Sequence, residues 1–151
     1  MIEIKNEKEI SLIEKASKIV AETLVLLKES AKPGVSTAYL DKMAYENIIK
    51  NKARPAFLGY RGFPATCCIS VNEEVIHGIP SDKKILNDGD LVSVDIGSVY
   101  DGYYGDAAIS FIIGTPKSQE HLKLLKVCEG ALYKGLDEIK EGARLGNVSY
   151  A

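Results

Sequence analysis

The residues of this sequence best suited to chemistry are two aspartates, Asp95 and Asp106, in a segment that otherwise alternates apolar and small or polar residues. The alternation predicts two β-strands joined at Asp101-Gly102, a dipeptide typical of two-residue hairpin turns. In that register Asp95 faces Ala108, and Asp106 is its diagonal neighbour on the same face of the hairpin. Diagonal neighbours lie ~7–8 Å apart, so two carboxylates placed this way can converge on one site.

Two interpretations of this aspartate pair are open. The carboxylates repel each other, and aspartate is a poor strand residue. Divalent cations ~3.5–4 Å apart and bridged by carboxylates would remove the conflict, and such pairs of ions catalyse hydrolysis. Alternatively, both residues lie on the solvated face of an antiparallel hairpin, where charged side chains are ordinary. The pattern taken by itself favours the solvated face.

A histidine, His77, stands in a short apolar stretch that Gly78 and Pro80 interrupt. A lone histidine in such a place is more often a hydrogen-bonded structural residue than a catalytic one, and the residue pattern leaves both roles open. The sequence contains no phosphate-binding glycine loop and no Cys/His zinc spacing, and it supports no nucleophile–base pair.

Helices are predicted on both sides of the hairpin. Asn6 and Glu9 have the spacing of a capping box at the start of the first helix, and Lys32-Pro33-Gly34 marks its end. A second helix follows at once, and a third is predicted from about Ser118 to Glu141, with apolar residues recurring at helical spacing.

The stretch between the second helix and the hairpin is mixed. Residues 53–66 contain two prolines and two glycines, which predicts an irregular loop, and the three aromatic residues in it predict a loop that packs down or shapes a pocket. From Cys67 onward the pattern becomes β, with strands predicted at residues 67–71 and 75–77 around a turn at 72–74.

The helix–turn–helix order at the start of the chain recurs at its end. Lys140-Glu141-Gly142 corresponds to Lys32-Pro33-Gly34, and Gly146-Asn147 is the predicted next cap. An internal repeat would divide the chain into one helix–helix–sheet unit and the first helix of a second. The alternative, that two helix ends merely look alike, stays open.

The composition is ordinary for a soluble globular domain, with 46% hydrophobic and 26% charged residues and a net charge of −2. It gives no indication of a nucleic-acid or anionic-membrane partner. Apolar runs fall short of the ~18–20 residues that a membrane span needs, and the charged N-terminus is unlike a signal peptide. Three cysteines, of which Cys67 and Cys68 are adjacent, form a poor disulfide framework and predict a reduced cytoplasmic protein.

Several segments, in this order and spacing, resemble type I methionine aminopeptidases over essentially the whole chain. They are the opening Lys32–Thr37, then Phe57–Pro64, Cys68–Glu73, His77-Gly78-Ile79-Pro80, Asp95-Ile96-Gly97 and Gly105-Asp106. The combination of the His-Gly-Ile-Pro element with the aspartate pair is specific to that family.

The resemblance implies the pita-bread fold, an α+β fold of two related halves with metal ions between them and an antiparallel sheet covered by helices. We therefore expect residues 1–151 to be a single, truncated catalytic domain: the first half plus the first helix of the second, with the second half absent. The implied activity is that of a two-metal aminopeptidase of the cytoplasm, which removes the N-terminal methionine from nascent proteins. The implied cofactors are two divalent ions, of Co, Fe, Mn or Zn.

The resemblance also implies a role for each matching residue. Asp95 and Asp106 become ligands of both metal ions, which reverses the balance between the two interpretations of the hairpin. His77 becomes a catalytic residue that contacts the substrate near the scissile bond. The pocket for the methionine side chain is expected to be formed partly by Phe57, Tyr60, Phe63 and Cys68. The expected partner is a nascent polypeptide with a free N-terminal methionine, with the ribosome as a candidate; no nucleic acid or membrane is expected.

The chain departs from the family in two respects. Position 57 is commonly Cys and position 63 commonly Tyr, so phenylalanine at both keeps the pocket apolar but changes its rim. The other metal ligands, one His and two Glu, and a second catalytic His lie in the family's second half, so we expect this fragment alone to be inactive. Two alternative functions stay open: a non-catalytic pita-bread binding module or remnant, and a proline-directed aminopeptidase of the same fold.

Overall fold

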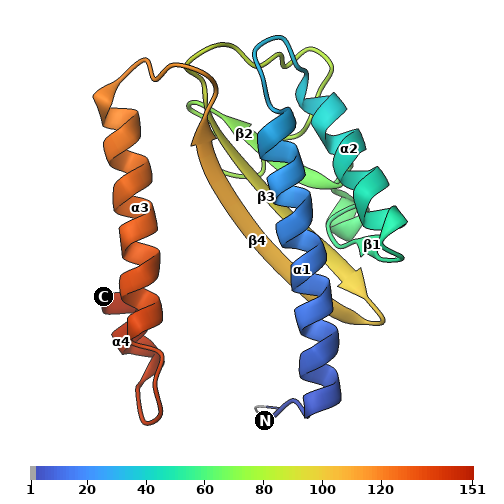
Figure 1. Cartoon of the computed structure of the whole chain (residues 1–151), viewed down its shortest axis with the longest axis vertical. Coiled ribbons are helices and arrows are strands. Elements are labelled where there is room, and N and C mark those ends of the chain that lie inside the picture. The colour runs from blue at the N-terminus through green and yellow to red at the C-terminus, as the bar shows by residue number, and fades with distance from the viewer. Residues whose placement is uncertain (1–2) are drawn as a thin grey trace. The chain divides into compact units, whose positions relative to one another are not determined.

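The computed structural model describes residues 3–151, and the chain divides into two compact units, one ending at Thr115 and the other comprising Pro116–Ala151 (Figure 1). The first unit contains, in order, α1 (Glu7–Ser30), α2 (Thr37–Lys50), β1 (Arg54–Pro55), the 3₁₀ turn η1 (Tyr60–Gly62), β2 (Cys67–Val71), β3 (Leu91–Tyr100) and β4 (Tyr103–Ile112). The second unit contains α3 (Gln119–Asp137) and α4 (Leu145–Tyr150).

Helix α1 begins at the predicted capping box. The Asn6 side chain accepts the backbone N–H of Glu9 at 3.0 Å, and the Glu9 carboxylate accepts the N–H of Asn6 at 2.8 Å. These bonds satisfy two of the backbone donors that a helix start leaves open. The helix ends before Gly34, whose φ of +90° turns the chain, and the Ser36 side chain then caps α2.

In the described residues, four strands form one antiparallel sheet with β3 at its centre. β4 pairs along the whole length of β3, and β2 and β1 pair with its other edge. The hairpin has the predicted register: Tyr100 pairs with Tyr103, and Asp101 and Gly102 have φ of +48° and +86°, as a type I′ turn requires. The predicted strand at 67–71 is confirmed as β2.

The predicted strand at residues 75–77 is wrong. These residues belong to an irregular loop, 72–80, in which Asn72 and His77 have left-handed backbone conformations that no strand accommodates. The apolar side chains that suggested a strand, Val75 and Ile76, are exposed. The loop bonds to its own side chains and to β2, and these contacts outweigh the β-propensity of two apolar residues.

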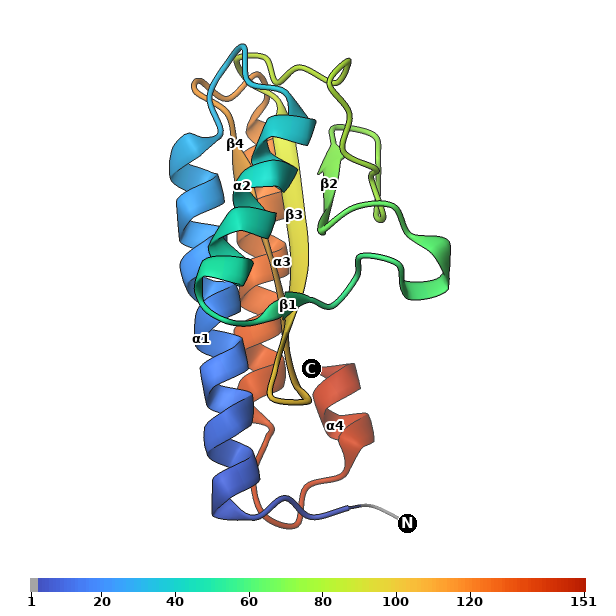
Figure 2. The same ribbon diagram turned by 90° about the vertical axis from the view of Figure 1, so that its right-hand side faces the viewer.

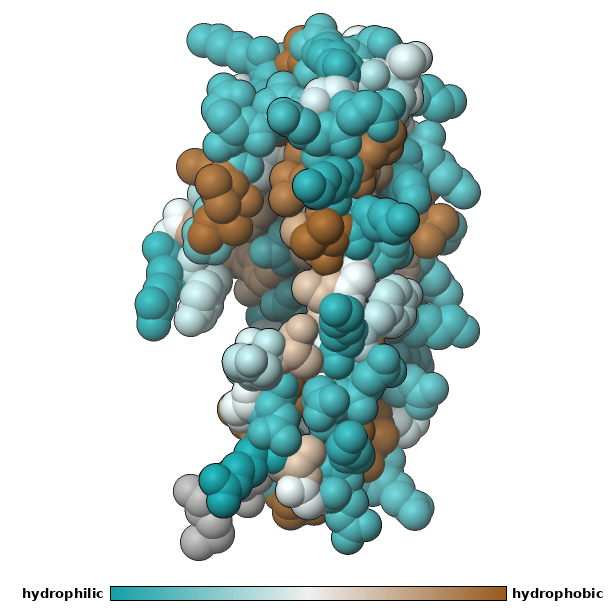
Figure 3. Space-filling model, turned by 90° about the vertical axis from the view of Figure 1, so that its left-hand side faces the viewer, coloured by the Kyte–Doolittle hydropathy of each residue, from teal (hydrophilic) through white to brown (hydrophobic). Residues whose placement is uncertain are grey.

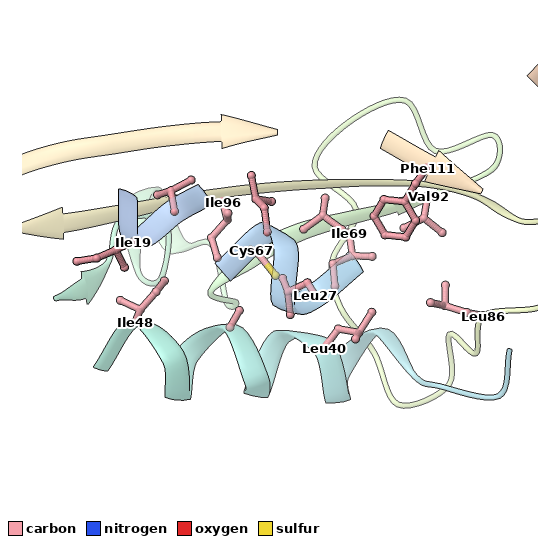
Figure 4. Packing of buried hydrophobic residues seen from close by; sticks show 14 of the residues in the cluster. Ile19, Leu27, Leu40, Ile48, Cys67, Ile69, Leu86, Val92, Ile96 and Phe111 are labelled. Atoms are coloured by element: carbon pink, nitrogen blue, oxygen red, sulfur yellow. The ribbon is translucent and has the colours of Figure 1, made fainter. Parts of the chain in front are cut away.

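Helices α1 and α2 cover one face of the sheet, and the hydrophobic core lies between these helices and the sheet (Figures 2 and 4). Successive strand residues point to opposite faces, so the fully buried residues of β3, Val92, Val94 and Ile96, all face the helices. The residues between them therefore point to the other face, where no helix of this unit lies. Among residues 3–151, no helix is long and apolar enough to cross a membrane.

The second unit repeats the turn that joins α1 and α2. Gly142 has a φ of +81° and follows α3, as Gly34 follows α1, and each turn leads into a further helix. The helix begins earlier than predicted: Arg144 is the N-cap residue, so Gly146 and Asn147 lie inside α4. Apolar side chains of this unit stand among polar ones at the surface (Figure 3), including Leu124, Val127, Leu132 and Leu136.

The contact of α1 with the hairpin depends on Gly105 of β4. A Cβ atom at Gly105 would lie 2.4 Å from the Ser17 nitrogen and 2.5 Å from the Ala16 carbonyl carbon. Its pairing partner Ser98 donates its hydroxyl to the Ala16 carbonyl at 2.9 Å. The helix backbone therefore touches the sheet directly at this point, one residue before Asp106.

Gly105→Ala should destabilise the protein, because backbone atoms cannot yield as a flexible side chain can. Overpacking of this kind costs about 1–3 kcal/mol. Urea unfolding followed by circular dichroism measures the loss. Gly130→Ala in α3 is the control, because nothing lies within 4 Å of a Cβ there. The control should be neutral or stabilising by up to about 1 kcal/mol; equal unfolding midpoints for the two variants would contradict the assigned contact.

Candidate active site

A pocket of about 670 Å³ opens on the face of the sheet opposite the helices. All of the residues for which the sequence predicted a role line it. The lining residues are Phe57, Tyr60, Arg61, Gly62, Phe63, Pro64, Cys68, His77, Ile79, Asp95 and Asp106. The structure thus brings together residues from five segments: the loop that carries Phe57, Tyr60 and Phe63 (the aromatic loop), β2, the 72–80 loop, β3 and β4.

Asp95 and Asp106 lie as diagonal neighbours on β3 and β4. Asp95 pairs with Ala108, Asp106 pairs with Gly97, and the ladder between them is continuous. Because no bulge interrupts the alternation, both carboxylates point to the pocket face. The prediction of a shared face is confirmed; the metal-binding role stays a prediction.

The ionisation of Asp95 is affected by the neighbouring carboxylate. Burial raises the pKa of the half-buried Asp95 carboxyl, the nearby Asp106 carboxylate raises it further, and His77 opposes the rise. Desolvation and a like charge both disfavour ionisation of an acid. A cation between the carboxylates would reverse both effects.

Gly97 brings the apolar wall of the pocket against the carboxylates. It is the pairing partner of Asp106 and follows Asp95 by two residues on the same face. A Cβ atom there would lie 2.8 Å from Cε1 of Phe57, so the phenyl ring rests on the bare backbone of β3. The N–H of Ala56 donates to the Gly97 carbonyl at 2.9 Å and holds the loop in place. Sequence reasoning missed this role, and only the Asp-Ile-Gly motif hinted at it.

The aromatic loop is stabilised by bonds within itself. The N–H of Gly59 donates to the Phe63 carbonyl at 2.8 Å, and the N–H of Phe63 donates to the Tyr60 carbonyl at 2.9 Å. Phe57 and Phe63 are half-buried, whereas Tyr60 is 64% exposed. The prediction that this loop shapes a pocket is confirmed, with Tyr60 at the rim.

Cys68 completes the wall beside the carboxylates, since it pairs with Asp95 across β2 and β3. Burial, and then the charges of Asp95 and Asp106, raise the pKa of its thiol to about 11. A thiol with that pKa is neutral near pH 7 and a poor nucleophile. It therefore serves as an apolar surface. Its neighbour Cys67 points into the core on the opposite face and donates to the Asp41 carboxylate; both cysteines are free thiols.

His77 is exposed at the pocket and is not part of the core. Packing therefore does not account for it. Its backbone has a φ of +57°, which is uncommon for a residue with a side chain and occurs most often in turns and at functional sites.

The comparison with known proteins agrees with this geometry. Residues 11–151 match the profile of metallopeptidase family M24. The chain belongs to metallopeptidase family M24. It is 50% identical to the methionine aminopeptidase of Clostridium acetobutylicum over 151 residues, which are all of this chain and 60% of that protein. It is 47% identical to methionine aminopeptidase 1 of Bacillus subtilis, again over 60% of that protein. This M24 chain thus spans about 60% of the length of the curated relatives it matches.

Solved structures give the same result for the fold. The methionine aminopeptidase of Thermotoga maritima superposes with a TM-score of 0.95 at 41% identity, covering 99% of this chain and 60% of that one. The prolidase of Pyrococcus furiosus superposes with a TM-score of 0.84 at 25% identity, covering 96% of this chain and 41% of that one. The predicted pita-bread fold is confirmed, and the likeness to methionine aminopeptidases exceeds that to the prolidase.

The donor set fits part of a divalent metal site. Carboxylate oxygens suit divalent ions of the first transition row, and the mutual repulsion of Asp95 and Asp106 leaves a cation favoured between them. Within residues 3–151, however, no group of three or more His, Cys, Asp and Glu side chains is placed to hold an ion. Asp95 and Asp106 are therefore two donors without a third such side chain placed beside them in this part of the chain.

Removing one charge of the aspartate pair should make the metal-free chain more stable. The folded state raises the pKa of Asp95, so its contribution to stability is full below the usual aspartate pKa and is lost as pH rises through the folded value. Asp95→Asn should therefore raise the melting temperature at pH 7 by roughly 1–3 °C, a small gain because the side chain is half-exposed.

Near pH 4, close to the usual pKa of an aspartate, that gain should shrink. Thermal melts in the presence of a chelator at the two pH values provide the measurement. Asp82→Asn, at an exposed position away from the pocket, is the control and should shift neither melt. A gain that is independent of pH would show that charge repulsion is not its cause.

Proposed function

We propose that the protein containing these 151 residues is a two-metal aminopeptidase that removes the N-terminal methionine from nascent polypeptides. The observation that carries this proposal is the placement of a carboxylate pair, an apolar aromatic wall and His77 around one pocket. An aminopeptidase for methionine needs these three parts side by side. Relatives named methionine aminopeptidase, at 47–50% identity, support the substrate class.

We further propose that residues 1–151 form the first half of a catalytic domain plus the first helix of its second half. The helix–turn–helix order at Gly34 recurs at Gly142, and the relatives are longer than this chain. The missing metal ligands would then come from a segment outside these 151 residues. This division agrees with a described part that supplies only a partial ligand set.

The chemistry assigns a task to each side chain. Asp95 and Asp106 would hold divalent ions, and such ions would supply a nucleophilic water near neutral pH and polarise a carbonyl group. His77, which is exposed and lines the pocket, would donate a hydrogen bond to the scissile amide or to the oxygen on which charge develops. The two functions would meet at this pocket, since Asp95 and His77 both line it.

The pocket wall selects the side chain. Phe57, Phe63 and the neutral Cys68 thiol offer an apolar surface directly beside the carboxylates. Burying a methionine side chain there contributes about 1.5–3 kcal/mol, which orients the adjacent peptide bond toward the metal ligands. The higher identity to methionine aminopeptidases than to the prolidase favours methionine over the proline-directed alternative, and retention of both aspartates opposes a non-catalytic module.

The setting of the activity follows from the same proposal. Free, buried Cys67 and Cys68 suit a reducing compartment, so we expect the protein to act in the cytoplasm, with the ribosome as a candidate partner. Cobalt, iron, manganese and zinc are the candidate metals, since all accept carboxylate and imidazole ligands.

A polypeptide of these 151 residues alone should bind divalent metal weakly and should not hydrolyse methionyl peptides. Two carboxylates leave most coordination positions to water, so tight binding is not expected. Titration calorimetry with Mn²⁺ and Co²⁺, together with an assay on a Met-Ala-Ser peptide, tests both points. Micromolar affinity with measurable turnover would mean that the site within this chain is complete.

In the full-length enzyme, His77→Ala should lower kcat/KM for methionyl peptides by about 10²-fold, because a donor to the developing charge is lost. Metal affinity and melting temperature should stay close to wild type, since His77 is exposed. Asp95→Asn and Asp106→Asn should instead weaken metal binding and activity together.

Steady-state kinetics, calorimetry with Mn²⁺ and thermal melts on the three variants distinguish the roles. Full activity of His77→Ala would refute its catalytic role. A large loss of melting temperature with normal activity per folded molecule would assign His77 to packing instead. Unchanged metal affinity in both aspartate variants would refute the metal site.

A further inference from the structure

The position of His77 is set by a loop and not by a helix or strand. Residues 72–80 leave β2 and return to it, and His77 lies near the end of this excursion. The left-handed φ of +57° at His77 is unfavourable for a residue with a Cβ atom. The conformation must therefore be maintained by contacts of the neighbouring residues, and those contacts decide where the imidazole points.

Gly78, directly after His77, is fixed to β2 by two hydrogen bonds. Its N–H donates to the Ser70 hydroxyl at 3.1 Å, and its carbonyl accepts the N–H of Ile69 at 2.8 Å. A Cβ atom at Gly78 would lie 2.2 Å from the Ile69 carbonyl oxygen, so only glycine allows this approach. The backbone after His77 is thus docked on the strand at close range.

Ser70 is the side chain of the sheet that takes part in this docking. It is 4% exposed and follows Cys68 by two residues, so it lies on the pocket face of β2. A buried hydroxyl on a strand that is paired with β3 has little freedom to move. Its bond to Gly78 therefore transmits the rigid position of the strand to the loop.

The other end of the loop is held by Glu74. One of its carboxylate oxygens accepts the N–H of Val71 at 2.9 Å, and Lys84 donates to both oxygens at 2.6 and 2.7 Å. Val75 and Ile76, between the two anchors, have exposed side chains that no burial holds in place. The direction of the His77 side chain therefore depends on two attachment points, the bonds of Glu74 before it and the Ser70–Gly78 bond after it. The second is adjacent to His77.

We propose that Ser70 is a positioning residue for His77. Its hydroxyl accepts the Gly78 N–H and thereby holds the imidazole toward the pocket, although Ser70 itself does not line the pocket. This inference rests on the proposed catalytic role of His77. One hydrogen bond on the pocket face of β2, from the Gly78 N–H to the Ser70 hydroxyl, then controls how precisely the imidazole is positioned.

A double-mutant cycle in the full-length enzyme tests it. Ser70→Ala should lower kcat/KM for a methionyl peptide roughly tenfold, because small displacements of a reacting group are costly. In a His77→Ala background the same change should have no further effect, since the group that Ser70 positions is gone. Ser70→Cys, which keeps the size but accepts hydrogen bonds weakly, is the second variant and should show the same dependence on His77.

Ser98→Ala is the matched control, because Ser98, like Ser70, is a buried serine of a strand. Its hydroxyl, however, faces α1 and donates to the Ala16 carbonyl. It should lower stability and leave kcat/KM unchanged. Amide hydrogen exchange in the metal-free enzyme adds a readout independent of turnover: exchange at Gly78 should quicken in Ser70→Ala and not in Ser98→Ala.

Three outcomes would overturn the inference. An equal loss from Ser70→Ala with and without His77 would assign Ser70 to general stability. Wild-type activity of both Ser70 variants, alongside a His77→Ala enzyme that is impaired, would show that the bond to Gly78 is dispensable. A fully active His77→Ala enzyme would refute the proposed role of His77 itself, and with it any positioning by Ser70.

Discussion

The alternation of side chains along β3 is the constraint on which the rest of the structure depends. One face of this central strand carries Val92, Val94 and Ile96, which are buried under α1 and α2. The other face carries Asp95 and Gly97. Slippage by one residue would place the carboxylate in the core and the apolar residues at the pocket. The same hydrophobic burial that stabilises the sheet therefore directs the two carboxylates proposed as metal ligands to the pocket face.

The pocket also has an unfavourable electrostatic contact. Asp95 and Asp106 share one face, and both burial and their mutual repulsion act against ionisation of Asp95. Asp95 is half-buried beside the neutral Cys68 thiol, so water screens its charge less than at a fully exposed position, whereas Asp106 is exposed. The repulsion between Asp95 and Asp106 lowers the stability of the metal-free fold. A cation bound between the two carboxylates would replace this repulsion by attraction.

Two irregular segments contribute the other residues of the pocket, and each packs against the sheet at a glycine. The aromatic loop rests on Gly97, where the missing side chain admits the Phe57 ring. The 72–80 loop docks through Gly78 beneath Ser70 and Ile69. At both places a Cβ atom would collide with the docked segment, so close backbone approach, and not regular structure, sets the geometry of the pocket.

The capping box at Asn6, the hairpin register and the common face of Asp95 and Asp106 could be predicted from the sequence, because they depend on neighbouring residues or on a period of two along one hairpin. The resemblance to methionine aminopeptidases supplied the expected roles. Three other features became visible only in the folded chain: residues 75–77 form no strand, Phe57 lies on Gly97, and Gly78 bonds to Ser70. Those features depend on segments brought together by folding, and such contacts leave no periodic signal in the chain.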